Sequence, residues 1–450
     1  LLGRDTGSAT GDDTPNGNVL IYGGTVDLDG AANDREAIVQ NNSGNSLYLR
    51  STVNAMGGFT KGGLQNVHLE SPNNFSGVVN IAQGALYVRD NDALRGASEV
   101  NVQGDGVLVM INGATVTNVD LRAGERPYGS PGLISETGHN IVGGDIMVEN
   151  VDPQGTIQHD VRLRASANNE NATLTILGDI GMTEGGAYSD INLNDSVQVS
   201  FNESGGILNL KGTFGDRLVD GVAVPISEFA PGQSRVEGGW ISNRGATENF
   251  LLRFNIDGNG GGNRGDELNV NIYNQWNAAG RIYAQQGTIR YLGEGDFWTS
   301  NALAAANFAD GQSGFQLAGG GTDQNGAVTV LLTKDGQVFN AERWTVDAAN
   351  NANNTVTMGL EHFGPSNVTV TIGNNWNDPG ANSDDNRITI NGSSATAQRE
   401  FRLFAHDGYD SLSSNATAGT VNVLQSIRGN DNSRSEERRV GKECRARWSP

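Results

Sequence analysis

Two oxygen-rich clusters come closest to carrying chemistry in this sequence. The first lies in a glycine-rich stretch and supplies Asp257, Asn259, Asn263 and Asp266. Hard cations such as calcium take about six to eight oxygen ligands, so these side chains form a candidate calcium site. The spacing departs from an EF-hand loop, because Gly261 stands where a third acidic or amide ligand belongs. The spacing therefore favours a solvated turn over a metal site.

The second cluster consists of Asp378, Asp384 and Asp385, shortly after Trp376. Paired carboxylates beside an aromatic platform are typical of glycosidases and of sugar-binding grooves. Aspartate is also an ordinary corner residue, and a chain with 51 acidic residues contains close pairs without any catalytic role. The cluster is therefore a weak candidate for binding or cutting a polysaccharide.

Other enzyme motifs do not occur in this sequence. It contains no Gly-x-Ser-x-Gly nucleophile turn, and the glycine-rich run 257–265 lacks the Gly-Lys-Ser/Thr ending of a phosphate loop. The five histidines are scattered singly, which argues against a histidine-rich zinc centre. We predict that they are solvent or corner residues, with His68 on the outward face of its strand. The single cysteine, Cys444, excludes a disulfide within the chain.

Composition and charge exclude several classes of protein. Lys and Arg number 30 and Asp and Glu 51, so the net charge is −21, which argues against a nucleic-acid-binding protein. Because no run of about 18 apolar residues is present, no helix is expected to span a membrane. Hydrophobic residues make up 36 %, too many for a wholly disordered chain. The 63 glycines lack a three-residue period, which excludes collagen.

The elements that position these residues are predicted to be short β-strands. Runs of alternating apolar and polar residues end at Gly, Asn or Asp, which is typical of strands with one buried face. Clear examples are 46–50, 85–88, 106–111, 173–176, 206–210, 367–372 and 387–390. Sandwiches and closed barrels rarely exceed about 250 residues, so the pattern favours a solenoid whose turns bury their inner faces against each other. Asparagines of successive turns would then stack, and we expect amide ladders between them.

Residues 57–111 carry the clearest repeat. It begins with two glycines, an apolar residue and Thr-Lys, passes an Asn-aromatic-x-Gly corner, and closes with Gly and Leu-x-Val. The matching residues are Gly57, Gly58, Phe59, Thr60, Lys61, Val67, Leu69, Asn74, Phe75, Gly77, Val79, Ile81, Gly84, Leu86 and Val88. This segment resembles the autotransporter-associated β-strand repeat of bacterial passenger domains. The rest of the chain shares the texture of short strands and Gly/Asn corners.

The resemblance implies a right-handed parallel β-helix that is exported and either displayed on the cell surface, at the outer membrane, or released from it. Expected partners are surface glycans or proteins of host or neighbouring cells, without nucleic acid. The resemblance also implies a C-terminal anchor or barrel domain beyond this sequence. No cofactor is expected, with calcium at the first oxygen-rich cluster as the single candidate.

The end of the sequence differs from the rest. Residues 434–450 read RSEERRVGKECRARWSP and lack the Asn/Gly/Val texture upstream. This stretch resembles the translation of a sequencing adapter. We therefore expect a β-helix passenger-like domain over 1–433 and a non-native tail over 434–450.

The sequence as a whole predicts an all-β protein with a parallel β-helix solenoid. Its expected function is non-enzymatic: an extracellular or cell-surface rod for structural or adhesive display. Two alternatives stay open, namely a β-helical polysaccharide lyase or glycoside hydrolase, and a carbohydrate-binding stalk. An enzyme of this kind would present a long groove with converging aspartates and basic residues on one side.

Overall fold

The computed structural model describes part of the chain, and the structural statements below concern that part. The described residues are 3–4, 18–28, 36–122, 131–149, 159–165, 172–178, 180–183, 197–202, 206–212, 214–219, 222–224, 250–255, 269–275, 281–284, 287–297, 314–317, 326–340, 343–346, 354–362, 368–373, 387–390, 399–407, 420–424 and 426–429. The chain forms two compact units. Unit 1 comprises Leu1–Val199 and Gly205–Leu208, and unit 2 comprises Ser200–Ser204 and Asn209–Pro450.

Every helix or strand within the described residues is a β-strand, which confirms the all-β class. Unit 1 contains β1 (Gly3–Arg4), β2 (Val19–Ile21), β3 (Thr25–Asp27), β4 (Ala37–Gln40), β5 (Leu47–Leu49), β6 (Thr52–Ala55), β7 (Phe59–Gly62), β8 (Val67–Leu69), β9 (Asn74–Phe75), β10 (Gly77–Val88), β11 (Ala97–Ile111), β12 (Thr115–Val116), β13 (Asn118–Arg122), β14 (Pro131–Thr137), β15 (His139–Val142), β16 (Ile146–Glu149), β17 (His159–Ala165), β18 (Thr173–Ile176) and β19 (Ile180–Thr183). Strands β20 (Val197–Asn202) and β21 (Ile207–Leu210) have residues in both units. Unit 2 contains β22 (Phe214–Val219), β23 (Val222–Val224), β24 (Phe250–Asn255), β25 (Asn269–Ile272), β26 (Arg281–Ala284), β27 (Gly287–Tyr291), β28 (Gly314–Leu317), β29 (Gly326–Leu332), β30 (Val338–Phe339), β31 (Arg343–Val346), β32 (Asn354–His362), β33 (Thr369–Ile372), β34 (Arg387–Ile390), β35 (Arg399–Asp407), β36 (Thr420–Val423) and β37 (Ser426–Gly429).

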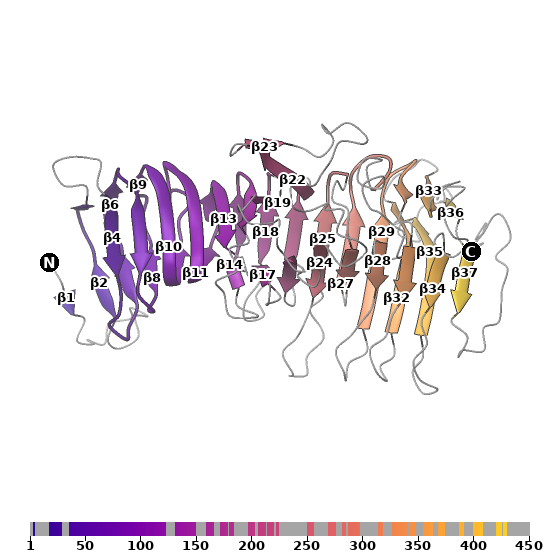
Figure 1. Cartoon of the computed structure of the whole chain (residues 1–450), viewed down its shortest axis with the longest axis horizontal. Coiled ribbons are helices and arrows are strands. Elements are labelled where there is room, and N and C mark those ends of the chain that lie inside the picture. Colours follow the sequence, from indigo (N-terminus) through magenta and orange to yellow (C-terminus); the bar gives the residue numbers. More distant parts are fainter. Residues whose placement is uncertain are drawn as a thin grey trace, which may run out of the picture. The chain divides into compact units, whose positions relative to one another are not determined.

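In unit 1 the strands form parallel rows, and the chain contributes one strand to each row in a fixed order before it begins the next round. Strands β4, β5 and β6 are followed by β7, β8 and β9, and each pairs in parallel with its counterpart one round later. A parallel pair cannot be joined by a tight hairpin, so the chain must cross away from the sheet and return between partners. Strands β10 and β11 are the longest of the unit, with 12 and 15 residues, and run side by side (Figure 1). This order and register are compatible with a parallel β-helix.

Side chains at matching register positions form the buried core of unit 1. Leu49 pairs with Leu69, Leu69 with Val88, and Val88 with Met110. None of these four side chains is more than 3 % exposed. The strand period of two explains this arrangement, because alternate residues of each strand point to the same side of the sheet. Burial of stacked aliphatic side chains contributes roughly 25 cal/mol for each Å² of apolar surface removed from water.

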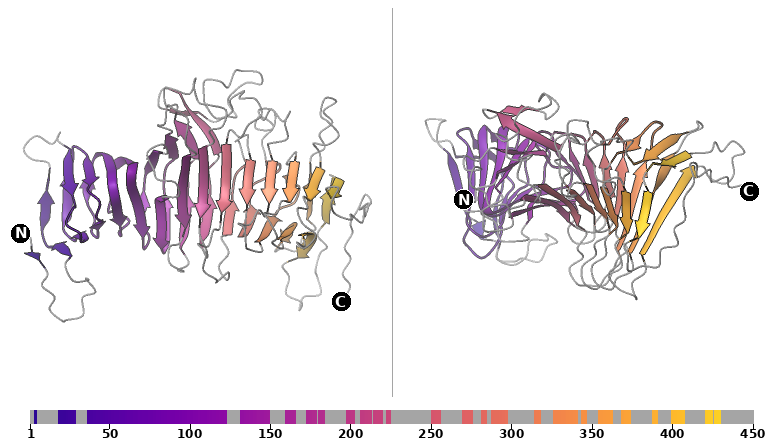
Figure 2. Two further views of the ribbon diagram at one scale, coloured as in Figure 1. Left: turned by 60° about the horizontal axis from the view of Figure 1, so that its bottom comes forward. Right: turned by 45° about the vertical axis from the view of Figure 1, so that its right-hand side comes forward.

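Unit 2 repeats this pattern of parallel rows. One row contains β25, β27, β29, β32 and β35. A second parallel row contains β24, β26, β28, β31, β34 and β37, and a third contains β30, β33 and β36. The later strands of unit 2, coloured orange to yellow in Figure 2, follow one another as successive parallel strands. Core positions again align, as in the column Val270, Ile289, Val330 and Met358, whose side chains are at most 2 % exposed.

Asparagines connect successive strands through their side-chain amides. The Asn74 Nδ2 group donates a hydrogen bond to Asn54 Oδ1 at 2.9 Å in unit 1. In unit 2, Asn271 Nδ2 donates to Asn209 Oδ1 at 2.9 Å. Each of these contacts is one step of the kind that the predicted amide ladders require. Because each amide offers both a donor and an acceptor, the same residue can contact the strand before it and the strand after it.

Candidate functional site

The residues predicted to bind calcium or sugar lie outside the described part of the chain. These are Asp257, Asn259, Asn263 and Asp266 of the first cluster, and Trp376, Asp378, Asp384 and Asp385 of the second. The tail 434–450 also lies outside the described residues. The repeat residues between 57 and 111 are all described, so the site is built from them and from a polar cluster around Tyr291 and Gln337 in unit 2.

The repeat positions serve mainly to build the core. Phe59, Leu69, Ile81, Leu86 and Val88 are completely buried. The remaining matched aromatic residue, Phe75, packs against the Phe59 ring with centroids 5.2 Å apart. Aromatic pairs in this tilted arrangement add stability beyond the area that they bury.

Lys61 is a charged residue at a core position. It lies two residues after Phe59 on β7, pairs in register with Ile81 of β10, and is completely buried. Its Nζ group donates to the carbonyl oxygen of Gly63 at 2.6 Å and to that of Gln83. Burial lowers the pKa of Lys61 to about 8 from 10.5. A lysine of lowered pKa can act as a nucleophile, but this amine is enclosed and bonded to backbone carbonyls, so its role here is structural.

The sequence pattern already contained the signal for this buried lysine. Alternation places Lys61 in the same phase as Phe59, which faces the core. A charged side chain is almost never fully buried unless it is paired, and the two carbonyl groups provide that pairing here. The resemblance marked Lys61 as a repeat residue without indicating that it faces inward.

His68 corrects a prediction made from the sequence. It does alternate with the inward residues Val67 and Leu69, but its side chain is only 4 % exposed rather than solvent-facing. Its ring is stacked between Tyr48 at 4.1 Å and Tyr87 at 4.2 Å, the residues at the same register position on the neighbouring strands. Tyrosines on the two adjacent strands therefore cover His68, which the alternation pattern alone would place in solvent.

The stacked histidine is held in its neutral form. Among the described residues, neither ring nitrogen of His68 has a hydrogen-bond partner. Burial first, and the positive charge of Arg89 second, lower the pKa of His68 to about 3. The ring therefore acts as an aromatic spacer and not as an acid or base near neutral pH.

A charged column runs beside the aromatic column. Glu70 lies between Arg50, whose Nε is 2.6 Å from Glu70 Oε2, and Arg89, whose Nε is 3.4 Å from Glu70 Oε1. All three residues are partly exposed. Opposite charges on neighbouring strands stabilise their pairing, so this column fixes the register of β5, β8 and β10 from outside the core.

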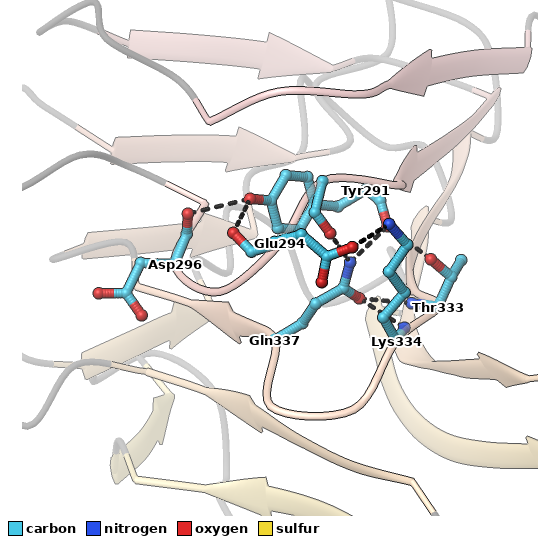
Figure 3. Close-up of polar contacts among 7 residues, drawn as sticks. Tyr291, Glu294, Asp296, Thr333, Lys334 and Gln337 are labelled. Atoms are coloured by element: carbon cyan, nitrogen blue, oxygen red, sulfur yellow. Dashed lines mark hydrogen bonds and ion pairs between the residues drawn. The ribbon is translucent and has the colours of Figure 1, made fainter. Parts of the chain in front are cut away.

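The most densely bonded polar cluster of unit 2 surrounds Tyr291 and Gln337 (Figure 3). The buried hydroxyl of Tyr291 donates to the carbonyl oxygens of Glu294 at 2.9 Å and Asp296 at 3.0 Å. The Gln337 amide donates to the carbonyl oxygens of Tyr291 and Gly293, at 3.0 and 2.7 Å.

The other end of the Gln337 side chain is also satisfied. Its Oε1 accepts hydrogen bonds from the backbone N–H groups of Thr333, at 2.6 Å, and Lys334, at 2.9 Å. At the rim, Lys334 Nζ lies 2.5 Å from Glu294 Oε1 (Figure 3). One buried glutamine thus connects two corners that are far apart in sequence.

The electrostatics of this cluster favour neutral groups. Burial, followed by the charges of Asp296 and Glu294, raises the pKa of Tyr291 far above its usual value. Burial also raises the pKa of Asp296. A tyrosine that stays protonated and donates to two carbonyl groups holds a corner together but is unsuited to proton transfer. The cluster was not predicted, because Tyr291 and Gln337 carry no local motif that connects them.

The polar contacts among the described residues therefore stabilise the fold. Among them, no group of three or more His, Cys, Asp or Glu side chains is placed to hold a metal ion. Nor does the described part of the chain contain a helix long and apolar enough to cross a membrane. Comparison with known proteins finds no matching family, no similar curated protein and no similar solved structure.

Proposed function

We propose that this chain is a right-handed parallel β-helix that works outside the cell or on its surface, by structural and adhesive display and without catalysis. The observation that carries the proposal is the repeated order of strands, in which β4, β5 and β6 pair one by one with β7, β8 and β9. A scaffold of this kind gains length with each added round, because each round buries its inner face on the last. The right hand follows from the general preference of parallel crossover connections.

The repeat over 57–111 supports an autotransporter-type passenger. The residues of its signature are the ones that make a round stackable: Phe59 and Leu69 fill the core, and Gly58, Gly77 and Gly84 take positive φ angles at corners. The proposal includes export to the cell surface and attachment through a domain outside this sequence.

The internal use of polar groups supports a role without catalysis. Among the described residues, the buried polar side chains of Lys61, Tyr291 and Gln337 are each bonded to backbone carbonyl groups of the chain itself. Arg50, Glu70 and Arg89, which are partly exposed in unit 1, are paired with one another. Polar groups that are bonded in this way position the strands, and we propose that recognition takes place on the outer surface.

The test measures adhesion and cleavage on the same samples. The purified full chain is immobilised on beads and incubated with neutral and acidic polysaccharides and with whole cells, and both retention and new sugar ends are measured. We expect saturable retention without new reducing or unsaturated sugar ends. Cleavage would contradict the proposal, and its loss in the Asp378→Asn, Asp384→Asn, Asp385→Asn variant would assign it to that cluster. Absence of both retention and cleavage would overturn the adhesive role.

A further inference from the structure

We propose that the outward face of β4 and β7 in unit 1 binds a neutral polysaccharide, with Ile38 as an apolar centre between two polar side chains, Glu36 and Gln40. These residues stand at alternate positions of the chain, so their side chains share one face. All three are exposed, and Ile38 is 61 % exposed. Ala37, between the first two, is 4 % exposed and belongs to the core. The face that carries the proposed site therefore points to solvent.

Two glycines next to β4 make room for the polar side chains. Gln40 of β4 pairs in register with Gly62 of β7. A Cβ atom at Gly62 would lie 3.1 Å from Gln40 Cγ, so a methyl group there would push the Gln40 side chain aside. At Gly58 a Cβ atom would lie 4.0 Å from Glu36 Cγ, in ordinary contact. Both side chains therefore lie close to the surface of the sheet, one on each side of Ile38.

These side chains also keep polar atoms available for a ligand. Glu36 Oε1 accepts hydrogen bonds from Thr60 Oγ1 and, at 3.1 Å, from Asn80 Nδ2 of β10. The two bonds hold the carboxylate across two strands. Within the part of the chain that the structure describes, Glu36 Oε2 and the Gln40 amide have no hydrogen-bond partner. An acceptor and an amide, which can both donate and accept, are thus presented beside an exposed aliphatic side chain.

This combination favours a sugar polymer as the ligand. A sugar ring can pack its C–H groups on Ile38, while its hydroxyl groups donate to the Glu36 carboxylate and accept from the Gln40 amide. Binding sites commonly combine apolar contact with a few such polar groups. Strand residues rise about 3.3 Å each, so Glu36 and Gln40 are roughly 13 Å apart along the chain. That distance exceeds the width of one sugar ring, which favours a polysaccharide over a monosaccharide.

The charge and pairing of these strands favour a neutral polysaccharide over charged polymers and peptides. Lys61 is the single basic residue of β4, β7 and β10, and it is completely buried. An acidic polysaccharide would therefore meet the Glu36 carboxylate and no basic side chain from these strands. A peptide adds to a sheet at an unpaired strand edge, and both edges of β7 are paired, with β4 and with β10. The inference rests on the proposed function, because it names the ligand class for the adhesive role.

The experiment measures binding of the full chain and its variants to immobilised dextran, mannan and xyloglucan by biolayer interferometry. Polygalacturonate and polylysine serve as acidic and basic probes. The test variant is Ile38→Ala, Gln40→Ala. The matched control, Leu424→Ala, Gln275→Ala, removes an exposed aliphatic side chain and an exposed amide from unit 2. A third variant, Gly62→Ala, keeps every proposed ligand group and displaces only the Gln40 side chain. Circular dichroism and melting temperatures confirm that each variant folds.

We expect the parent to bind at least one neutral polysaccharide more tightly than it binds polygalacturonate or polylysine. Added salt should leave this binding unchanged, because no ion pair contributes to it. The test variant should bind roughly tenfold or more weakly, because it loses both the apolar contact and the amide hydrogen bonds. The control should match the parent, and Gly62→Ala should lie between the parent and the test variant.

Three results would overturn the inference. The first is binding to none of the three neutral polysaccharides, and the second is equal affinity of the test variant and the control. The third is tighter binding of a charged polymer; polylysine binding that is lost in Glu36→Gln and in added salt would indicate a basic protein as the partner. If neutral polysaccharide binding fails while adhesion to cells persists, this inference is wrong and the proposed function stands.

Discussion

The ammonium group of Lys61 occupies the space that a side chain at Gly84 would need. A Cβ atom at Gly84 would lie 2.5 Å from Lys61 Nζ and 2.6 Å from the carbonyl oxygen of Leu64. Gly84 also has a φ of +62°, which side chains rarely adopt. The carbonyl oxygens of Gly63 and Leu64 would block the added methyl group even if the flexible lysine side chain moved, so this position requires glycine, and Lys61 fills the space beside it.

Replacing this glycine should be costly. We expect Gly84→Ala to lower the free energy of unfolding by on the order of 3 kcal/mol, from the close contacts together with the positive φ. The matched control is Gly44→Ala, where φ is +81° but no atom lies within 4 Å of the added methyl group. It should cost only about 1 kcal/mol. Thermal melting followed by circular dichroism compares the two, and equal losses would mean that the close contacts around Gly84 have no effect.

Removing the buried amine should change how stability depends on pH. The pKa of Lys61 is about 8 in the folded chain and 10.5 as its ordinary value. Between these values the unfolded chain binds a proton that the folded chain does not, so the stability of the parent should rise with pH across this window. The total rise attributable to Lys61 is on the order of 3 kcal/mol. Lys61→Met should lack this component, as measured by melting temperatures from pH 7.5 to 10. A parent and variant with parallel pH profiles would contradict the assignment.

The stacked histidine should sensitise the protein to acid. The pKa of His68 is lowered to about 3, chiefly by burial. Below pH 6.5 the unfolded chain therefore binds a proton that the folded chain excludes, and stability falls as the pH falls toward 3. His68→Phe keeps a ring between Tyr48 and Tyr87 and removes the titrating group. Between pH 7 and pH 4 its free energy of unfolding should therefore fall by less than that of the parent, with a difference on the order of 3 kcal/mol. His139→Phe, at an exposed position, serves as the control and should retain the acid sensitivity of the parent.

The polar corner of unit 2 should depend on one amide. Gln337→Leu conserves volume but leaves the N–H groups of Thr333 and Lys334 without their acceptor and removes the amide donor from the carbonyl group of Gly293, whereas the Tyr291 carbonyl keeps the Thr333 hydroxyl at 2.8 Å. Buried groups left unsatisfied cost about 1 to 3 kcal/mol each, so we expect a total loss of roughly 3 kcal/mol. Gln275→Leu removes an exposed amide that makes one hydrogen bond, 3.0 Å to the Asp296 carbonyl oxygen. Hydrogen exchange at Thr333 and Lys334 should accelerate in the first variant only.

Strand positions were largely predictable, and strand partners were not. The alternating run 387–390 coincides with β34, and 106–111 lies within β11, because a half-buried strand must alternate. Alternation is a local property, however, and does not specify that Leu49 pairs with Leu69 rather than with a strand in a hairpin. The parallel arrangement was expected from chain length and from the resemblance over 57–111.

The contacts that define the site depend on residues far apart in sequence. His68 is buried only because tyrosines from the rounds before and after stack on its ring. Gln337 bonds to Tyr291, 46 residues earlier, through a backbone carbonyl group that any residue could provide.

The one-to-one pairing of β4, β5 and β6 with β7, β8 and β9 has a consequence for the gene that encodes this chain. An unequal crossover between the codons of Leu49 and Leu69 would delete or duplicate one complete round and rejoin the chain at the same register position. Each remaining round would still meet a neighbour of the same kind. Alleles of different length could therefore arise by recombination while retaining a continuous core.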